Sequence, residues 1–178
     1  MRKLKNEELN RIDQDSFQTA PKMPVTIVLD NIRSMHNVGA TFRTSDAFRV
    51  ERIVLTGITA QPPHRDIHKA ALGATETVTW SYEKDPDQAV KALKEQGYTI
   101  LAIEQSEEST FLDQFAPDVN QKYALIFGNE VFGVDDQVME LVDGCLEIPQ
   151  FGTKHSINIS VSVGLVIWDF YCKLKPFG

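Results

Sequence analysis

The chain has 178 residues, of which 42% are hydrophobic and 24% are charged, with 18 Lys and Arg against 25 Asp and Glu. This length suits one domain with its own core, and no apolar run approaches the roughly 18 residues that a membrane span needs. The first residues are too polar for a signal peptide, and two cysteines without paired spacing exclude a disulfide framework and a zinc cluster. We therefore expect a cytoplasmic protein.

Predicted strands and helices alternate along the chain. We expect an N-terminal appendage over 1–24 and one domain over 25–178. Apolar and β-branched runs predict strands at 25–29, 52–55, 77–80, 98–103, 123–127 and 145–148. Helical spacing predicts helices at 37–48, from 86 to near 97 and at 135–142, and the stretch 59–76 is expected to be a long loop with one helical turn. This alternation indicates an α/β domain with a mostly parallel sheet and helices on both faces.

The last apolar segment, 157–171, supports two interpretations. Its first half alternates apolar and polar residues as a strand does, whereas its second half places apolar residues at helical spacing. Its length and its lack of turn residues favour a single helix that is apolar around much of its circumference. A helix of this kind is buried, and at the end of a small domain it often packs against a partner subunit.

The charge is distributed unevenly. A formal net charge of -7 argues against a nucleic-acid partner, because phosphate binding depends on Lys and Arg. Residues 31–70, however, carry six basic and three acidic side chains (net +3), whereas residues 76–147 carry four basic and sixteen acidic ones (net -12). A basic region on an acidic body can attract a polyanion locally. Ordinary surface scatter is the alternative explanation.

Several common sites are missing from the sequence. No dinucleotide-binding glycine pattern follows the first strand, the segment from Gly128 to Gly133 lacks the Lys and Ser/Thr of a phosphate-binding loop, and no hydrolase Gly-x-Ser-x-Gly occurs. His64 and His68 have the spacing of metal ligands but lack a third ligand, so we expect no metal site.

Three polar segments begin where predicted strands end: 30–48, 126–134 and 148–160. The carboxyl ends of parallel strands are where α/β proteins bind their ligands. Structural roles could explain individual residues in these segments, since Asn37 and Ser156 are possible helix N-caps.

Two further residues in these segments also have more than one interpretation. Glu130 can be a charge at a helix N-terminus. Arg43 follows Asn37 by just under two helical turns, so both side chains can border one cleft.

Taken together and in this order, the three segments resemble the motifs of the TrmH/SpoU branch of the SPOUT methyltransferases. The resemblance covers roughly residues 25–172, and Val131 departs from it because the family commonly has glycine there. The matching motif residues are Asn37–Thr44, Gly128–Glu130, Ile148 and Pro149, Gly152, and Ser156–Ser160.

This resemblance implies an RNA methyltransferase that transfers a methyl group from S-adenosyl-L-methionine to a ribose 2′-hydroxyl of tRNA or rRNA. It also implies an α/β fold with a C-terminal trefoil knot and a homodimer, without a membrane or a metal. By the same resemblance, the 157–171 helix contributes to the knot and to the dimer contact.

The resemblance also assigns roles to individual residues. Arg43 is expected at the reacting ribose and its phosphate, where a guanidinium can stabilise a developing alkoxide. Its high intrinsic pKa argues against a role as base, although the resemblance implies that role with help from the RNA phosphate, so both roles stay open. The other expected catalytic residues are Asn37, Glu130, Ser156 and Asn158. The expected cofactor-binding residues are Glu104, Phe127, Gly128, Asn129, Ile148, Ser156 and Ile157. The expected RNA-binding residues are Arg33, Arg43, Arg65, His68, Lys69 and Lys154.

Two alternatives remain open at this point. The first is a non-catalytic RNA- or protein-binding homodimer with the same fold, which the acidic composition favours and the intact set of polar motif residues disfavours. The second is methylation of a base, which Arg43 and the segment Ser156–Asn158 disfavour. The sequence does not decide between tRNA and rRNA.

Overall fold

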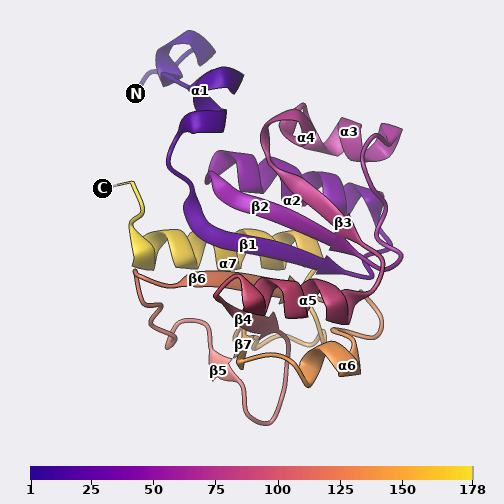
Figure 1. Cartoon of the computed structure of the whole chain (residues 1–178). Helices are drawn as coiled ribbons and strands as arrows, with labels where there is room; N and C mark the ends of the chain where they lie inside the picture. Colours follow the sequence, from indigo (N-terminus) through magenta and orange to yellow (C-terminus); the bar gives the residue numbers. More distant parts are fainter. Residues whose placement is uncertain (178) are drawn as a thin grey trace.

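Seven parallel strands form one sheet through the middle of the molecule (Figure 1). The computed structural model describes residues 1–177. The strands are β1 (Met23–Asp30), β2 (Val50–Thr56), β3 (Trp80–Glu83), β4 (Tyr98–Ile103), β5 (Thr110–Phe111), β6 (Lys122–Phe127) and β7 (Gly144–Glu147). Their order across the sheet is β3-β2-β1-β6-β4-β7-β5. Because all strands are parallel, their carboxyl ends lie along one edge.

Strand β1 lies in the middle of the sheet. Its Leu29 is in register with Leu55 of β2 on one side and with Phe127 of β6 on the other. All of β1 except Pro24 is buried. Such a strand needs apolar side chains on both faces, which explains its continuous apolar run.

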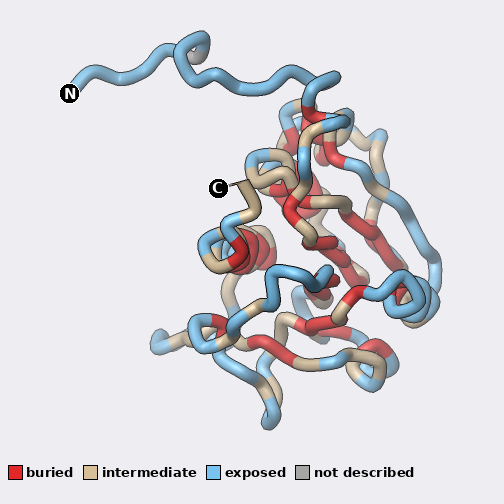
Figure 2. Tube along the Cα trace, turned by 60° about the vertical axis from the view of Figure 1, so that its left-hand side comes forward, coloured by how far each residue is buried: buried red, intermediate tan, exposed pale blue. Residues whose placement is uncertain are grey.

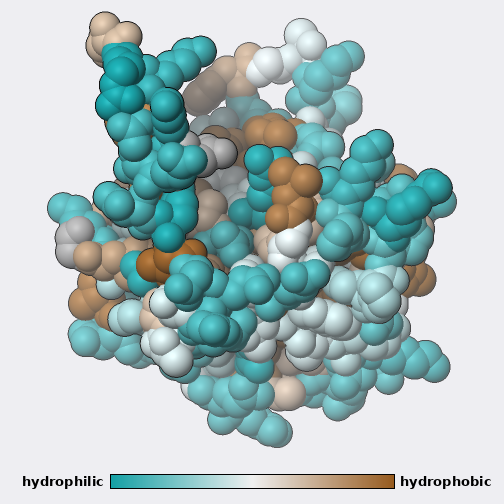
Figure 3. Space-filling view, turned by 90° about the horizontal axis from the view of Figure 1, so that it is seen from above, coloured by the Kyte–Doolittle hydropathy of each residue, from teal (hydrophilic) through white to brown (hydrophobic). Residues whose placement is uncertain are grey.

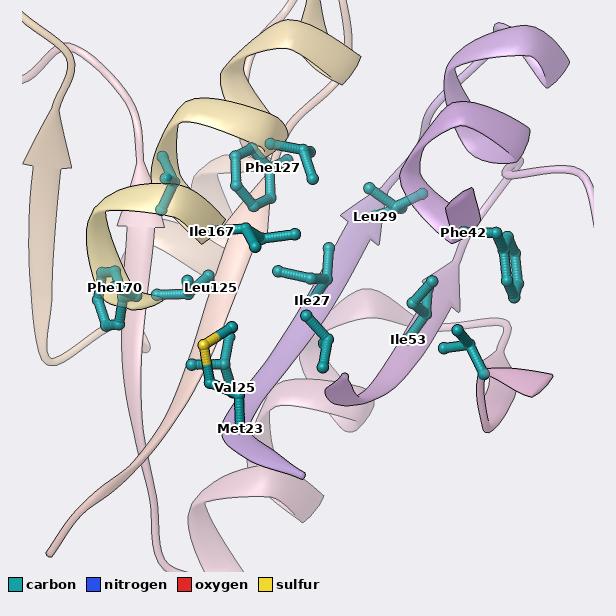
Figure 4. Packing of buried hydrophobic residues seen from close by; sticks show 14 of the residues in the cluster. Met23, Val25, Ile27, Leu29, Phe42, Ile53, Leu125, Phe127, Ile167 and Phe170 are labelled. Atoms are coloured by element: carbon teal, nitrogen blue, oxygen red, sulfur yellow. The ribbon is translucent and has the colours of Figure 1, made fainter. Parts of the chain in front are cut away.

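Helices cover both faces of the sheet, as predicted. One face packs against α2 (Met35–Ala47), α3 (Arg65–Ala71) and α7 (Ile159–Leu174), and the other against α5 (Pro86–Glu95) and α6 (Asp136–Met139). Figure 4 shows Ile27 of β1 beside Ile167 of α7, and Leu125 of β6 beside Phe170 of α7. The short α4 (Ala74–Thr77) lies beside α3 at the upper side of Figure 1.

The prediction of a long loop over 59–76 is wrong, because α3 and α4 occupy most of it. Ile67 and Ala71 are buried and give α3 an inward face, which the surrounding Pro, His and Lys residues obscured in the sequence. The strand predicted at 77–80 is also displaced, since residue 77 ends α4 and β3 begins at Trp80.

Two smaller differences concern the second half of the chain. Helix α6 has four residues rather than the eight predicted at 135–142. Strand β5 was not predicted, because it has only two residues and both are exposed. A pair of exposed residues carries no alternation that a sequence pattern could detect.

The helical interpretation of the last apolar segment is confirmed by α7. Its buried side carries Val163, Val166, Ile167 and Phe170 at helical spacing. The alternation in its first half arises because Val161 is half-exposed on the opposite side. The C-terminal trefoil knot stays a prediction.

The residues before β1 extend away from the sheet and are mostly exposed (Figure 2). They include η1 (Asn6–Leu9) and α1 (Gln14–Thr19). Phe17 of α1 is buried and joins the main core cluster. Within residues 1–177, no helix combines the length and apolar character that crossing a membrane requires.

Gly39 is the point at which α2 and α3 come closest. A Cβ on Gly39 would lie 2.4 Å from the Ile67 carbonyl oxygen and 2.7 Å from Ala70 Cβ. We expect Gly39→Ala to force the helices apart and to lower the free energy of unfolding by about 1–3 kcal/mol. Urea denaturation measures this change.

Gly164 of α7 provides the control, because its added Cβ would meet no atom within 4 Å. Gly164→Ala should leave the stability unchanged or raise it by up to about 1 kcal/mol, since alanine favours a helix interior over glycine. Equal stability of the Gly39→Ala protein and the parent would contradict the proposed clash.

Candidate active site

A cleft of about 780 Å³ opens at the carboxyl ends of β4, β6 and β7. Most of its lining residues come from the three segments that follow these strands, within 103–105, 127–134 and 148–159. This is the edge of the sheet at which the sequence predicted a binding site. All seven residues expected to bind the cofactor line this cleft, as do Glu130 and Asn158.

Asn129 organises the loop that follows β6. Its backbone exchanges two hydrogen bonds with Gly133, at 2.8 and 2.9 Å between N and O. Its Oδ1 accepts from the amides of Val131 and Phe132, and its Nδ2 donates to the Asn31 carbonyl oxygen at 2.6 Å. A buried amide with all these partners fixes the loop as a tight turn.

Gly128 and Gly133 allow this turn to close. Gly133 has a φ of +73°, a conformation that glycine adopts without strain. A Cβ on Gly128 would lie 2.1 Å from both Gly133 C and Val134 N. The backbone on the two sides of the turn therefore comes together in the space that a side chain on Gly128 would fill.

Glu130 connects this loop to the start of α2. Its carboxylate accepts hydrogen bonds from the amides of Arg33 (3.2 Å) and Ser34 (3.3 Å) and from Asn37 Nδ2 (3.2 Å). Partial burial opposes ionisation of Glu130, but hydrogen bonds from backbone amides and from Asn37 outweigh it, so its pKa lies below the ordinary value. The carboxylate thus stabilises the N-terminus of α2 from outside that helix.

We expect Glu130→Gln to lower the free energy of unfolding by about 0.3–1 kcal/mol at pH 7, because the helix N-terminus loses a negative charge. The depressed pKa gives wild type a contribution that is present above the carboxyl pKa of the unfolded chain. That contribution is lost as the pH falls through the lower pKa of the folded state. Unfolding measured from pH 7 to pH 3 should therefore show the two proteins converging in acid.

Glu140 supplies a matched control, because it is exposed and lies at the end of α6. The free energy of unfolding of the Glu140→Gln protein should differ little from that of wild type at every pH. If the difference in free energy of unfolding between the Glu130→Gln protein and wild type did not vary with pH, the role assigned to the ionised carboxylate would be contradicted.

Glu104 holds the loop from the other side of the cleft. Its Oε1 accepts from the Gln105 amide at 2.9 Å and its Oε2 from the Val134 amide at 3.3 Å. The carboxylate also lies against Gly133, where a Cβ would come within 2.3 Å of Oε2. Glu104 therefore borders the cleft and braces the turn that Gly128 and Gly133 form.

The segment before α7 closes the cleft. Ser156, Ile157 and Asn158 all line it. The possibility that Ser156 is the N-cap of the last helix is wrong, because Asn158 has that role and its Oδ1 accepts from the Ser160 amide at 3.0 Å. Ser156 is exposed, and its hydroxyl does not cap α7.

The structural alternatives for Asn37 and Glu130 have different outcomes. Ser34, rather than Asn37, is the N-cap of α2, and its hydroxyl accepts from the Asn37 amide. Glu130 lies in a loop and is a charge at a helix N-terminus, but that helix is α2 rather than the one that follows β6. Asn37 is buried and directs its side chain to Glu130.

Sequence analysis missed several residues of this region. Gln105 and His155 line the cleft, and Gln105 Nε2 donates to the His155 carbonyl oxygen at 3.4 Å. Gln105 follows the end of β4 directly, so its position after a predicted strand was an available signal.

Asp30 and Asn31, at the end of β1, accept hydrogen bonds from the loop that follows β6. Asp30 is buried and accepts from the Asp135 amide at 3.0 Å, and burial raises its pKa although hydrogen bonds oppose this. Asn31 has a φ of +56° and its Oδ1 accepts from the Ile58 amide. An Asp-Asn pair after a strand can indicate such a turn.

Arg43 does not lie in the cleft. It is exposed on α2, and neither Arg43 nor Asn37 is among the residues that line this cleft, so the placing of both side chains at one cleft stays a prediction. The other residues expected to bind RNA are exposed as well, and lie just before α2, on α3 and in the 148–158 segment: Arg33, Arg65, His68, Lys69 and Lys154. Across residues 1–177, no group of three or more His, Cys, Asp or Glu side chains could hold a metal ion.

Comparison with known proteins identifies the family. The model of the SpoU rRNA Methylase family matches residues 24–168, which include β1 apart from Met23, the cleft and most of α7. The chain belongs to the SpoU methylase family. Of the three segments that resemble SpoU motifs, 30–48 contains α2, and 126–134 and 148–160 each form a wall of the cleft.

Individual relatives show how far the similarity extends. The 23S rRNA (guanosine-2′-O-)-methyltransferase RlmB of Neisseria meningitidis is 32% identical over 154 residues, 86% of this chain and 60% of that protein. This SpoU chain thus spans less than two thirds of that relative. The tRNA (guanosine(18)-2′-O)-methyltransferase of Thermus thermophilus is 28% identical over 169 residues, 95% of this chain and 84% of that one.

A solved structure shows the same fold. The AdoMet-bound rRNA methyltransferase from Sinorhizobium meliloti superposes with a TM-score of 0.78 at 21% identity, covering 90% of this chain and 60% of that one. The α/β fold predicted from the resemblance of the three segments to SpoU motifs is therefore confirmed, whereas its knot stays a prediction.

Proposed function

We propose that this chain transfers the methyl group of S-adenosyl-L-methionine to a ribose 2′-hydroxyl of RNA. One observation carries the proposal: a single cleft holds all seven expected cofactor-binding residues, and Glu130 joins its wall to the helix that bears Arg43. Relatives named as rRNA and tRNA 2′-O-methyltransferases support it.

The cleft residues fit S-adenosyl-L-methionine. A volume of about 780 Å³ is in the range of small-molecule sites, and the lining combines apolar Ile148 and Met139 with the Glu104 carboxylate. The space left by the missing Cβ of Gly128 keeps the backbone turn beside the cleft tight. Backbone around Gly128, Ile148 and Ile157 would hold the adenosine part, and Glu104 suits ribose hydroxyls or a cationic group. When bound, the cofactor supplies an electrophilic methyl group.

The protein's part of the reaction is to position and stabilise. A ribose hydroxyl is a weak nucleophile, so holding it in line with the methyl group accounts for much of the rate. The Arg43 guanidinium contacts the substrate phosphate in a bidentate manner and stabilises negative charge developing on the ribose oxygen. Glu130 and Asn37 fix the helix from which Arg43 projects. Ser156 and Asn158 shape the opposite wall.

A homodimer would complete this site. Arg43 is exposed on α2, outside the cleft of its own chain. Helix α7 lies beside α2, since Trp168 packs edge-on against Phe48 at 5.9 Å between ring centroids. The outer side of α7 carries Val161, Leu165 and Trp168 at helical spacing, all 43–53% exposed. A second copy packed on this face would cover the apolar stripe and would bring Arg43 into an interface, within reach of the partner's cleft.

We expect Trp168→Glu to convert a dimer into a monomer and to reduce methyl transfer at least about tenfold, because a charge in a buried apolar contact is costly. Size-exclusion chromatography with light scattering measures the assembly. Glu95→Gln, an exposed change on α5 at the other face of the sheet, is the control. An active monomer would contradict the shared site.

The reaction itself is tested by methyl transfer from tritiated S-adenosyl-L-methionine to total tRNA and to rRNA, followed by nucleoside analysis. A 2′-O-methylated nucleoside in one pool supports the proposal and identifies the RNA class. Methylation of a base would overturn it. Absence of both incorporation and cofactor binding would favour a non-catalytic binding dimer instead.

A further inference from the structure

A second cavity of about 260 Å³ lies outside the cleft and shares no lining residue with it. It is enclosed by α3, α4, the start of β3 and the segment before α3. Its walls include Pro62, Pro63, His64, His68, Glu76 and Trp80. This part of the molecule lies at the upper side of Figure 1, a surface that is largely hydrophilic when seen from above (Figure 3).

The walls of the cavity suit a flat unsaturated ring. Trp80 is partly exposed, and its ring is held edge-on against Phe42 at 6.5 Å between centroids and 84° between planes. His64 Nδ1 accepts from the Asp66 amide at 3.2 Å, which fixes the imidazole and leaves Nε2 available. Aromatic and imidazole rings are the surfaces on which proteins stack unpaired bases.

Glu76 gives the cavity a polar edge. Its Oε2 receives one hydrogen bond, from Gln14 Nε2 at 3.4 Å, so the carboxylate retains capacity to accept others. Among the four RNA bases, guanine alone presents two neighbouring N–H donors, N1–H and the exocyclic amine, on its Watson–Crick edge. A carboxylate accepts such a pair, whereas it offers nothing to the ring nitrogen acceptor of adenine.

Positive charge lies next to the cavity. Arg65 and Lys69 are exposed and lie one helical turn apart on α3, each directly following a cavity residue, His64 or His68. Arg65 contacts Asp66 through Nε at 3.3 Å, so its terminal nitrogens can still reach a phosphate. Guanidinium and ammonium groups in this place would hold the backbone on either side of a base.

The cavity is mechanically connected to the candidate active site. Helix α3 packs tightly on α2 at Gly39, and α2 carries Arg43 and begins at the hydrogen bonds of Glu130. An RNA bound at α3 is therefore held next to α2, the helix on which Arg43 lies.

From these observations we propose that the cavity between α3, α4 and Trp80 binds one unpaired guanine base of the RNA substrate, away from the ribose that is methylated. The inference rests on the proposed function, because it assigns the bound base to the substrate. Its role is to select RNA in which a guanosine lies at a fixed distance from the target nucleotide.

The experiment measures binding of short unstructured RNAs to the full chain by tryptophan fluorescence. The chain has two tryptophans, so Trp168→Phe leaves Trp80 as the reporter and Trp80→Phe leaves Trp168. The probes are the pentanucleotides UUGUU, UUAUU and UUIUU, where inosine lacks the exocyclic amine of guanine. Guanosine 5′-monophosphate tests whether a free nucleotide is the ligand.

We expect UUGUU to quench Trp80 and to bind roughly tenfold more tightly than UUAUU, with UUIUU between them. Glu76→Gln should remove this preference, because the amide presents its own N–H groups to the base. Glu95→Gln on α5 should retain it. Quenching should be absent when Trp168 is the only reporter.

Equal binding of UUGUU and UUAUU would overturn the proposal, as would a guanine preference that survives Glu76→Gln. Tighter binding of guanosine 5′-monophosphate than of UUGUU would overturn the assignment to RNA. Methyl transfer by the Glu76→Gln protein is measured in parallel. If wild type transfers no methyl group, the proposed function fails regardless of the pentanucleotides; if transfer is intact but guanine preference is absent, only this inference fails.

Discussion

Replacing Arg43 by alanine should reduce methyl transfer by about 100- to 1,000-fold, the effect typical of removing one group that stabilises developing negative charge. Arg43 is exposed and makes no side-chain hydrogen bond within residues 1–177, so its loss should not lower the stability of the folded chain. Binding of S-adenosyl-L-methionine should also persist, because Arg43 does not line the cleft. Single-turnover transfer and calorimetric cofactor binding measure the two quantities separately.

Arg43→Lys is the informative companion. Lysine keeps the charge but cannot make a planar bidentate contact with phosphate, so it should restore only part of the lost rate. Arg49→Ala is the control, because it removes a guanidinium that packs over the Phe177 ring, and it should keep wild-type methyl transfer. Wild-type transfer by the Arg43→Ala protein would remove Arg43 from the mechanism.

Gly128→Ala should abolish binding of S-adenosyl-L-methionine while most of the fold survives. The added Cβ would lie 2.1 Å from backbone atoms of Gly133 and Val134, and backbone cannot move aside as the end of a flexible side chain can. The turn would have to open, and it would separate Glu104 from the Val134 amide. We expect cofactor affinity to fall by at least about 100-fold, because a loop displaced by an ångström or more no longer matches its ligand. Calorimetry measures the affinity, and circular dichroism reports the remaining fold.

Gly144→Ala tests whether this loss is specific to the turn. Its Cβ would meet only the end of the Leu101 side chain, at 3.2 Å, which can move. Cofactor affinity should therefore remain within about twofold of the parent. Normal affinity in the Gly128→Ala protein would show that the turn is not part of the cofactor site.

The sequence predicted the central strands well because burial on both faces leaves a continuous apolar run. The strand predicted at 98–103 coincides with β4, and 123–127 falls within β6. Helix α3 was missed because its inward face depends on Ile67 and Ala71 alone, and tertiary packing against Gly39 stabilises what seven residues cannot stabilise by themselves.

The candidate site was predictable as a set of residues but not as an arrangement. The strand ends located the segments that line the cleft, since parallel strands bring their carboxyl ends to one edge. No pattern indicated that Glu130 would stabilise a helix that begins almost a hundred residues earlier, because such contacts depend on the order of strands in the sheet. The exposed position of Arg43 was also not predictable, since it depends on the rotation of α2 about its own axis.

The strand order also has a consequence for how the chain acquires its structure during synthesis. β4 pairs only with β6 and β7, which are both made after it, and β6 fills the place between β4 and β1. When residues 98–103 leave the ribosome they have no partner, and only β1, β2 and β3 can already be paired. The apolar edge of β1 then stays open until residues 122–127 arrive. We therefore expect nascent chains that end before residue 122 to be prone to aggregation and to depend on chaperones. We also expect the complete chain to refold slowly.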